Sequence, residues 1–238
     1  MNGYSNSQAS MDNHFEWTGE IMEKASYQFS TPVLANASER VLGPWTPRQM
    51  ILDGLVSLRK DDKATGRAYT IRLRRSSKPS RANAARTLAA YDAAPADSIV
   101  FIQLVDDLGG AVVGDIIAHR LKKLKVAGVV VEGPVRDIDG LIQFGPPIWY
   151  RNAVASGLEL AETEVEVQVA LQLGTALVEP GSIISIDRDG VFVFPGTHYE
   201  ALVSQADTIT AKEALVHAAL ENNETLLRVL NLDDEITP

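Results

Sequence analysis

Between Gly114 and Asp137 the chain reads GDIIAHRLKKLKVAGVVVEGPVRD, and the order of elements in this stretch narrows the possible folds most. Apolar residues at helical spacing are followed by a short apolar strand at 128–131 and then by a turn. Asp115 stands at the start of the helix, and after twenty further residues Arg136-Asp137 open the next element. A helix and a strand separate the two starts, so the fold can bring both to one place. Such an arrangement suits one metal ion and one small oxyanion.

Strand and helix patterns alternate along the rest of the chain, which predicts an α/β fold. The expected strands are 68–73, 98–104, an edge strand at 146–150, 163–169, and a hairpin of 182–186 and 191–194 around the turn Asp187-Arg188-Asp189-Gly190. The expected helices are 14–28, 33–41 after Ser30, Thr31 and Pro32, 87–93, a short helix ending near 142, and 199–230 with a break near Asp207-Thr208.

No internal repeat and no linker rich in proline or glycine divides the sequence. We expect a single domain over residues 13–238, preceded by a frayed polar segment at 1–12. This domain would carry a helical extension at its N-terminus and a helix at its C-terminus. After the strand at 68–73, the basic stretch RRSSKPSRANAAR predicts a solvated loop, with phosphate contacts as the alternative.

Composition and charge exclude several classes of function. The 238 residues carry a formal net charge of −9 at pH 7, which opposes non-specific binding to nucleic-acid phosphates. The chain has no cysteine, which rules out disulfides, thiolate nucleophiles and cysteine-bound zinc. No apolar run is long enough to span a bilayer, and the N-terminal residues lack the pattern of a signal peptide. We therefore expect a cytoplasmic protein without nucleic-acid or membrane partners.

The residue types at the two element starts fit oxyanion and metal chemistry. Backbone N–H groups of the first helical turn, including those of Ile116 and Ile117, can bind a carboxylate or a phosphate. Arg136 offers a planar fork for a carboxylate or an enolate oxygen. Asp137 offers hard oxygen ligands for Mg²⁺ or Mn²⁺, and magnesium often takes only one or two protein carboxylates. A structural interpretation stays open, because Asp115 and Asp137 can each act as a helix cap and Arg136 can pair with another acid.

The stretch from Leu108 to Leu141 resembles the family that contains the regulator of ribonuclease activity A (RraA) and the class II 4-hydroxy-4-methyl-2-oxoglutarate / 4-carboxy-4-hydroxy-2-oxoadipate aldolases. That family is marked by an aspartate, twenty residues and then Arg-Asp, and these positions match Asp115, Arg136 and Asp137. The flanking positions agree as well, namely Gly114, Ala127, Gly128, Gly133 and Val135. Weaker likeness extends to STPVLANA at 30–37, TGRAYTIR at 65–72 and VEPGSIISIDRDGVFVFP at 178–195.

The resemblance implies a three-layer β/β/α sandwich of the swivelling-domain type, assembled as a trimer or a dimer of trimers with the site between subunits. In the aldolases the residue matching Asp137 is the ligand of Mg²⁺ or Mn²⁺. Arg136 and the backbone of Gly114, Asp115, Ile116 and Ile117 would bind the 2-oxo acid, and Asp115 would also help to hold metal-bound water. A glutamate from the C-terminal helix of a neighbouring subunit completes the aldolase site. Glu213 matches that glutamate best, with a solvated helix face as the alternative.

The predicted function is therefore that of a divalent-metal-dependent lyase acting on a small 2-oxo acid. It would cleave a C–C bond through a pyruvate enolate, either by retro-aldol cleavage of a 4-hydroxy-2-oxo acid or by decarboxylation of oxaloacetate. Arg136, Asp115 and Glu213 are the expected catalytic residues. The alternative is a non-catalytic regulator that binds a protein such as a ribonuclease, because the family's namesake inhibits ribonuclease E by contact. A nucleotide site is only weakly indicated, since the glycines at 109, 110 and 114 have the order GGxxxG.

Four positions depart from the family pattern. Glu132 replaces the aspartate usual before the turn glycine, and Gly140 stands where many members carry an acid. Asn36 replaces a frequent aspartate, and His119 enters a helix that small residues normally line. These departures bear on the substrate more than on the metal site.

Overall fold

The computed structural model describes residues 29–43, 51–52, 54–174 and 176–232. The expected frayed segment 1–12 and the expected helix 14–28 lie outside these ranges. Both stay predictions, and so does the single domain over 13–238.

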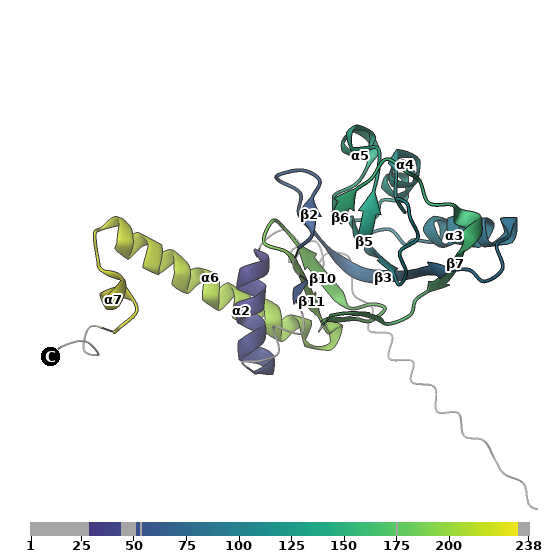
Figure 1. Ribbon diagram of the computed structural model, residues 1–238. Helices are drawn as coiled ribbons and strands as arrows, with labels where there is room; N and C mark the ends of the chain where they lie inside the picture. Colours follow the sequence, from purple (N-terminus) through teal and green to yellow (C-terminus); the bar gives the residue numbers. More distant parts are fainter. Residues whose placement is uncertain (1–28, 44–50, 53, 175, 233–238) are drawn as a thin grey trace, which may run out of the picture.

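Helices and strands alternate through the described ranges (Figure 1). The helices are α2 (Thr31–Leu42), α3 (Arg81–Asp92), α4 (Asp115–Lys123), α5 (Ile138–Phe144), α6 (Tyr199–Glu221) and α7 (Leu226–Val229), with the short 3₁₀ helices η2 (Leu160–Glu162) and η3 (Gly196–His198). The strands are β1 (Ile51–Leu52), β2 (Val56–Ser57), β3 (Ala64–Arg75), β4 (Ser98–Leu104), β5 (Gly128–Val135), β6 (Ile148–Ala153), β7 (Thr163–Val167), β8 (Leu171–Leu173), β9 (Ala176–Val178), β10 (Ile183–Ile186) and β11 (Val191–Phe194).

Most strands belong to one sheet with the order β1-β11-β10-β3-β4-β5-β6-β2, and β7 also pairs with β3. Strands β3, β4, β5 and β6 are parallel, which agrees with the predicted α/β class. The predicted hairpin is confirmed as β10 and β11, which pair antiparallel from Ile186↔Val191 to Ile183↔Phe194. The segment predicted as an edge strand at 146–150 does form a strand, β6, but the prediction that it lies at the edge of the sheet is wrong. β2 pairs with its outer side, with Val56 opposite Tyr150.

Helices α3, α4 and α5 cover one face of the parallel strands (Figure 1). Tyr91, Leu121 and Leu141 from these helices pack against strand residues such as Val100 and Val129 in one buried cluster. Burial of these apolar side chains supplies the main driving force for joining the helical layer to the sheet.

The opposite face of the same strands carries a second buried cluster. Phe101 of β4 and Trp149 of β6 pack there with Leu171, Val178 and Ile184 from β8, β9 and β10. A layer of helices, a sheet and a second layer of strands therefore follow one another, which confirms the predicted β/β/α sandwich. Because β4 and β5 are buried on both faces, they read as continuous apolar runs in the sequence.

A third cluster joins helices α2 and α6 to the hairpin. Phe192 and Phe194 of β11 belong to this cluster together with Leu34 of α2 and with Leu202 and Ile209 of α6. Beyond Ile209 every residue of α6 is half-buried or exposed, and Figure 1 shows this part of the helix extending away from the sheet. The expected N-terminal and C-terminal helices are thus both present.

Two predicted helix boundaries are corrected by the structure. Helix α3 begins at Arg81 rather than at 87, because the Ser80 side chain caps its first turn by accepting a hydrogen bond from the backbone N–H of Asn83 at 3.2 Å. Helix α6 continues through Asp207-Thr208 and ends at Glu221. The Thr208 hydroxyl is accommodated there by donating to the Ser204 carbonyl, at 3.0 Å.

Within the described ranges, no helix has both the length and the apolar character needed to cross a bilayer. Cytoplasmic location stays a prediction.

Candidate active site

Two neighbouring strands place the starts of α4 and α5 at the same edge of the sheet. β4 leads to α4 and β5 leads to α5, and parallel strands end at a common edge where ligands of open α/β sheets bind. The segment before α4 also pairs with the end of β5, through a bridge between Val113 and Val135. The backbone N–H of Arg136 donates to the Val113 carbonyl at 3.1 Å. These contacts bring Asp115 and Arg136-Asp137 together, as the spacing in the sequence predicts.

Glycines bring the predicted site residues close to one another. A Cβ atom built on Gly114 would lie 2.9 Å from Asp137 Oδ2 and 3.3 Å from Arg136 Nε. A Cβ atom built on Gly140 would lie 2.6 Å from the Cβ atom of Asp115. The absence of an acid at position 140 therefore has a steric reason, because any side chain there would displace Asp115.

Arg136 and Asp137 point to the same place because the backbone turns sharply between them. Asp137 has φ 59° and ψ 48°, a left-handed conformation that aspartate tolerates better than most residues. Arg136 Nε lies 3.3 Å from Asp137 Oδ2, and the two side chains are 43% and 45% exposed. Asp137 is the N-cap of α5, yet its carboxylate makes no capping hydrogen bond. The carboxylate is thus directed to the site and not to its own helix, which disfavours the capping interpretation.

The backbone at Gly157 packs closely against the Arg136 guanidinium, a contact that the sequence did not reveal. A Cβ atom built on Gly157 would lie 3.0 Å from Arg136 Cζ and would collide with Nη1. The segment around it is fixed, because Ala111 N donates to the Ser156 carbonyl at 2.9 Å and Leu158 N donates to the Ala111 carbonyl at 3.0 Å. Nothing in the local sequence pattern distinguishes this glycine from an ordinary turn residue.

The Asp115 carboxylate occupies one of the backbone N–H groups in the first turn of α4. Asp115 is the first helical residue, and Gly114 is the N-cap. Asp115 Oδ1 accepts a hydrogen bond from the backbone N–H of Ile116 at 2.8 Å. The N–H of Ile116, expected to face the substrate, is therefore already used in this conformation. The negative charge at this position also complements the helix dipole.

Tyr91 supports the loop that leads into α4. Its hydroxyl donates to the Val112 carbonyl at 3.3 Å, beside the residue that pairs with Arg136 N. Burial raises the pKa of the Tyr91 hydroxyl above its usual value of 10.0, so the group remains a neutral donor.

The carboxylates at this site fit a magnesium or manganese ion that takes only one or two of its ligands from the protein. Among the described residues there is no group of three or more His, Cys, Asp or Glu that could hold a metal. Mg²⁺ commonly binds through one or two carboxylates and keeps several waters, so a full protein cage is not required. Asp137, beside Gly114, and Asp115, beside Gly140, supply the carboxylate oxygens that these hard ions prefer as ligands.

Glu213 is the one predicted site residue that the fold places elsewhere. It is exposed on the extending half of α6 and lines a groove of about 330 Å³ with residues of α2, including Glu39 and Arg40, and with His217. Figure 1 shows α6 on the side of the molecule away from α4 and α5. Within one chain Glu213 therefore does not join Asp115 and Arg136, and a role in their site requires a second copy.

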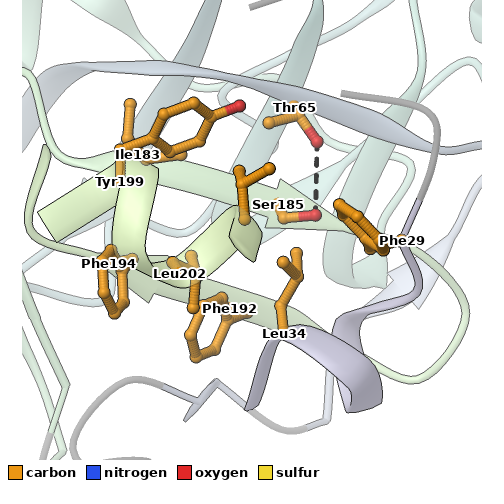
Figure 2. Close-up of a pocket in the computed structure, with 10 residues that line it drawn as sticks. Phe29, Leu34, Thr65, Ile183, Ser185, Phe192, Phe194, Tyr199 and Leu202 are labelled. Atoms are coloured by element: carbon orange, nitrogen blue, oxygen red, sulfur yellow. Dashed lines mark hydrogen bonds between the residues drawn. The ribbon is translucent and has the colours of Figure 1, made fainter. Parts of the chain in front are cut away.

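A second hollow lies between the hairpin and the terminal helices (Figure 2). Its volume is about 10 Å³, with Phe29, Leu34 and Phe192 among its apolar lining residues. The hydroxyls of Thr65 and Ser185 meet there, with Thr65 Oγ1 3.2 Å from Ser185 Oγ. A space of this size holds at most about one water molecule and excludes a 2-oxo acid.

Comparisons with known proteins identify relatives of this chain in sequence and in fold. The family model described as RraA-like (Aldolase/RraA) matches residues 34–193. A protein of Halalkalibacterium halodurans, whose name provisionally assigns it as a 4-hydroxy-4-methyl-2-oxoglutarate aldolase, is 30% identical over 185 residues, which cover 74% of this chain and 84% of the relative. The crystal structure of Streptomyces coelicolor RraAS2, titled an unusual member of the RNase ES inhibitor RraA protein family, has a TM-score of 0.71 at 23% identity and covers 84% of this chain and 97% of its own. An uncharacterized Pseudomonas syringae protein has a TM-score of 0.73 at 21% identity, with 89% and 97% covered.

Proposed function

Because the chain belongs to the RraA-like family of aldolases and RraA proteins, and because its fold gathers two carboxylates and a guanidinium at one edge, we propose that it is a divalent-metal-dependent lyase of 2-oxo acids. The supporting observation is the meeting of Asp115, Arg136 and Asp137 beside Gly114. The reaction is retro-aldol cleavage of a 4-hydroxy-2-oxo acid, decarboxylation of oxaloacetate, or both. The relative from Halalkalibacterium halodurans supports the aldolase activity.

The substrate's 2-oxo acid end is bound by Arg136 and the first turn of α4. The guanidinium fork matches a carboxylate or an enolate oxygen, and Gly157 keeps room for this fork. Backbone N–H groups at the helix start, from Gly114 to Ile117, favour the negative charge of the carboxylate. A substrate that uses the N–H of Ile116 must displace the Asp115 carboxylate from it.

Asp137 would hold the divalent ion, with Asp115 holding one of its waters. When bound, Mg²⁺ or Mn²⁺ supplies Lewis acidity toward the keto oxygen. The chain itself holds the carboxylates of Asp137 and Asp115 in place. Arg136 neutralises the substrate carboxylate and so holds the substrate in one orientation.

Bond cleavage needs a base for one proton and a stabiliser for one electron pair. In the aldol reaction a base at Asp115, acting through water, takes the C4 hydroxyl proton while the C3–C4 bond breaks. The bonding pair becomes the pyruvate enolate, and Arg136 stabilises the negative oxygen. A proton returned to C3 gives pyruvate. Decarboxylation of oxaloacetate breaks the same C3–C4 bond. C4 leaves as CO₂ and the bonding pair becomes the same enolate, so one site serves both reactions.

A homotrimer or a dimer of trimers would let Glu213 act in the site of a neighbouring copy. The exposed half of α6 that carries Glu213 includes Leu215, which is 74% exposed, and α7 adds Leu226 at 63%. Exposed leucines on these two helices offer apolar surface that a second copy could cover. The proposal requires this assembly to bring Glu213 of one copy beside Asp115 of another.

The test is release of pyruvate from oxaloacetate and from a panel of 4-hydroxy-2-oxo acids, with Mg²⁺, with Mn²⁺ and with EDTA. We expect activity only with metal. Asp137→Ala should abolish it, and Arg136→Ala should cost at least about 2.7 kcal/mol of transition-state stabilisation, the low end for one oxyanion donor.

Matched controls come from an exposed ion pair, in which Arg120 Nε lies 2.6 Å from Asp92 Oδ1. Asp92→Ala and Arg120→Ala should leave turnover unchanged. Full activity of Asp137→Ala or Arg136→Ala would refute the assigned roles. A wild-type chain that releases no pyruvate under any condition, yet inhibits a ribonuclease in the presence of EDTA, would establish the regulator instead.

A further inference from the structure

The helix that presents Asp137 is too short to hold its own position. α5 has seven residues, and helices of that length are unstable in isolation. It begins at a residue in the left-handed conformation and packs through Gly140 against Asp115. The placement of both site carboxylates therefore depends on what fixes the far end of α5.

Arg59 binds that far end. Its Nη2 donates to the carbonyl oxygens of Leu141 at 3.2 Å, Ile142 at 2.7 Å and Gly145 at 3.1 Å. Its Nη1 donates to the carbonyl of Pro146 at 3.2 Å. The last carbonyls of a helix lack partners within the helix, and a cation there complements the helix dipole. One guanidinium thus ties the end of α5 to the turn that starts β6.

Arg59 is itself held in place by its own segment. Its Nη1 lies 3.3 Å from both carboxylate oxygens of Asp62, whose side chain is 9% exposed. The Ser57 hydroxyl donates to the Arg59 carbonyl at 2.6 Å, and Leu58 N donates to the Ile148 carbonyl at 2.8 Å. The guanidinium is therefore anchored to the edge of the sheet and is not a loose surface group.

We propose that Arg59 is a positioning residue for the site, acting through α5 on Asp137 and, through Gly140, on Asp115. This proposal rests on the proposed function, because it assigns Arg59 a part in holding the same two carboxylates. Arg59 touches no substrate. Its effect is to keep the start of α5 at a fixed distance from the start of α4.

The experiment compares Arg59→Ala, Arg59→Lys and wild type in the full-length protein, at a temperature where circular dichroism shows each to be folded. Mn²⁺ affinity is measured by titration, and amide hydrogen exchange is followed at Leu141, whose N–H donates to the Asp137 carbonyl at 2.8 Å. For Arg59→Ala we expect the Mn²⁺ dissociation constant to rise about 10- to 100-fold, the range for residues that orient metal ligands, and exchange at Leu141 to accelerate. Arg59→Lys keeps the charge but has one nitrogen and cannot reach four carbonyls, so it should fall between the two.

Arg120→Ala is the control, since it removes an arginine and an ion pair from the same helical layer. It should match wild type in both measurements. If folded Arg59→Ala binds Mn²⁺ like wild type, or if Leu141 exchanges no faster, the proposal is overturned while the proposed function stands. If wild type neither binds Mn²⁺ nor releases pyruvate, the proposed function fails first, and the role of Arg59 fails with it.

Discussion

At the scale of single residues, the site depends on glycines as much as on charged side chains. Gly114 and Gly140 let Asp137 and Asp115 approach, and Gly157 leaves room for the Arg136 guanidinium. In each case a methyl group would occupy space that a functional side chain now fills. These positions therefore set the geometry of the site although they contribute no chemistry.

Gly157→Ala should displace Arg136 without changing any charge. We expect kcat/KM for a 2-oxo acid to fall about 100-fold, which is the cost of a misplacement of about 1 Å at a reacting group. Steady-state kinetics checks this. Gly196→Ala is the matched control, because a Cβ there meets its nearest atom at 3.6 Å, an ordinary contact. Equal kcat/KM values for the two variants would show that Gly157 does not determine the position of the Arg136 guanidinium.

At the scale of elements, α2 is fixed by a buried carboxylate from the hairpin turn. Asp187 is 6% exposed, and it accepts hydrogen bonds from Thr31 N at 2.8 Å and Thr31 Oγ1 at 2.5 Å. Asp189 N adds a third at 2.9 Å. Hydrogen bonds to a charged acceptor stabilise more than neutral ones. The hairpin turn thus serves as the cap of a helix more than 150 residues away in the sequence.

Asp187→Ala should leave Thr31 without these partners and detach the start of α2. We expect the free energy of unfolding to fall by about 3 kcal/mol, as measured by urea denaturation. The exposed neighbour Asp189 provides the comparison, since Asp189→Ala should change it by no more than about 0.5 kcal/mol. A loss at Asp187 no greater than that at Asp189 would contradict this account of the cap.

At the scale of the whole molecule, the proposed assembly of several copies can be tested at the extending half of α6. We expect light scattering to show a trimer or a hexamer. Leu215→Asp should shift the protein toward smaller species, because Leu215 is 74% exposed in one chain and would be buried between copies. Leu88→Asp on α3, where the side chain is 46% exposed, is the control and should not change the mass. A wild-type monomer at all concentrations would exclude the shared site and the role of Glu213.

The whole molecule should also lose stability at alkaline pH. Burial raises the pKa values of Tyr69, Tyr91 and Tyr199 above 10.0 in the folded chain. The unfolded chain releases these protons at lower pH, so stability is fully present below about pH 10 and is lost as pH rises above it. Urea denaturation across this range checks the direction. Tyr91→Phe should show a shallower decline, and an unchanged decline would mean that Tyr91 does not contribute.

Much of the fold and part of the site could be predicted from local pattern. The apolar runs of β4 and β5, the turn of the β10–β11 hairpin and the helix starting at Asp115 each have signals within a few residues. The spacing from Asp115 to Arg136-Asp137 also predicts that the starts of α4 and α5 lie close together, because parallel strands bring the elements that follow them to one edge of the sheet.

Contacts between distant segments were decided only by the tertiary structure. Three such contacts leave no periodic trace in the sequence. They are the fit of Gly157 against Arg136, the hydrogen bonds from Arg59 to carbonyls at the end of α5 and just beyond it, 82 to 87 residues away, and the capping of α2 by Asp187. The position of Glu213 was likewise decided by the tertiary structure. Its match to the family by sequence does not predict that α6 extends away from the sheet (Figure 1). The physical reason is that periodicity reports which face of an element is buried, whereas packing alone determines which residue it is buried against.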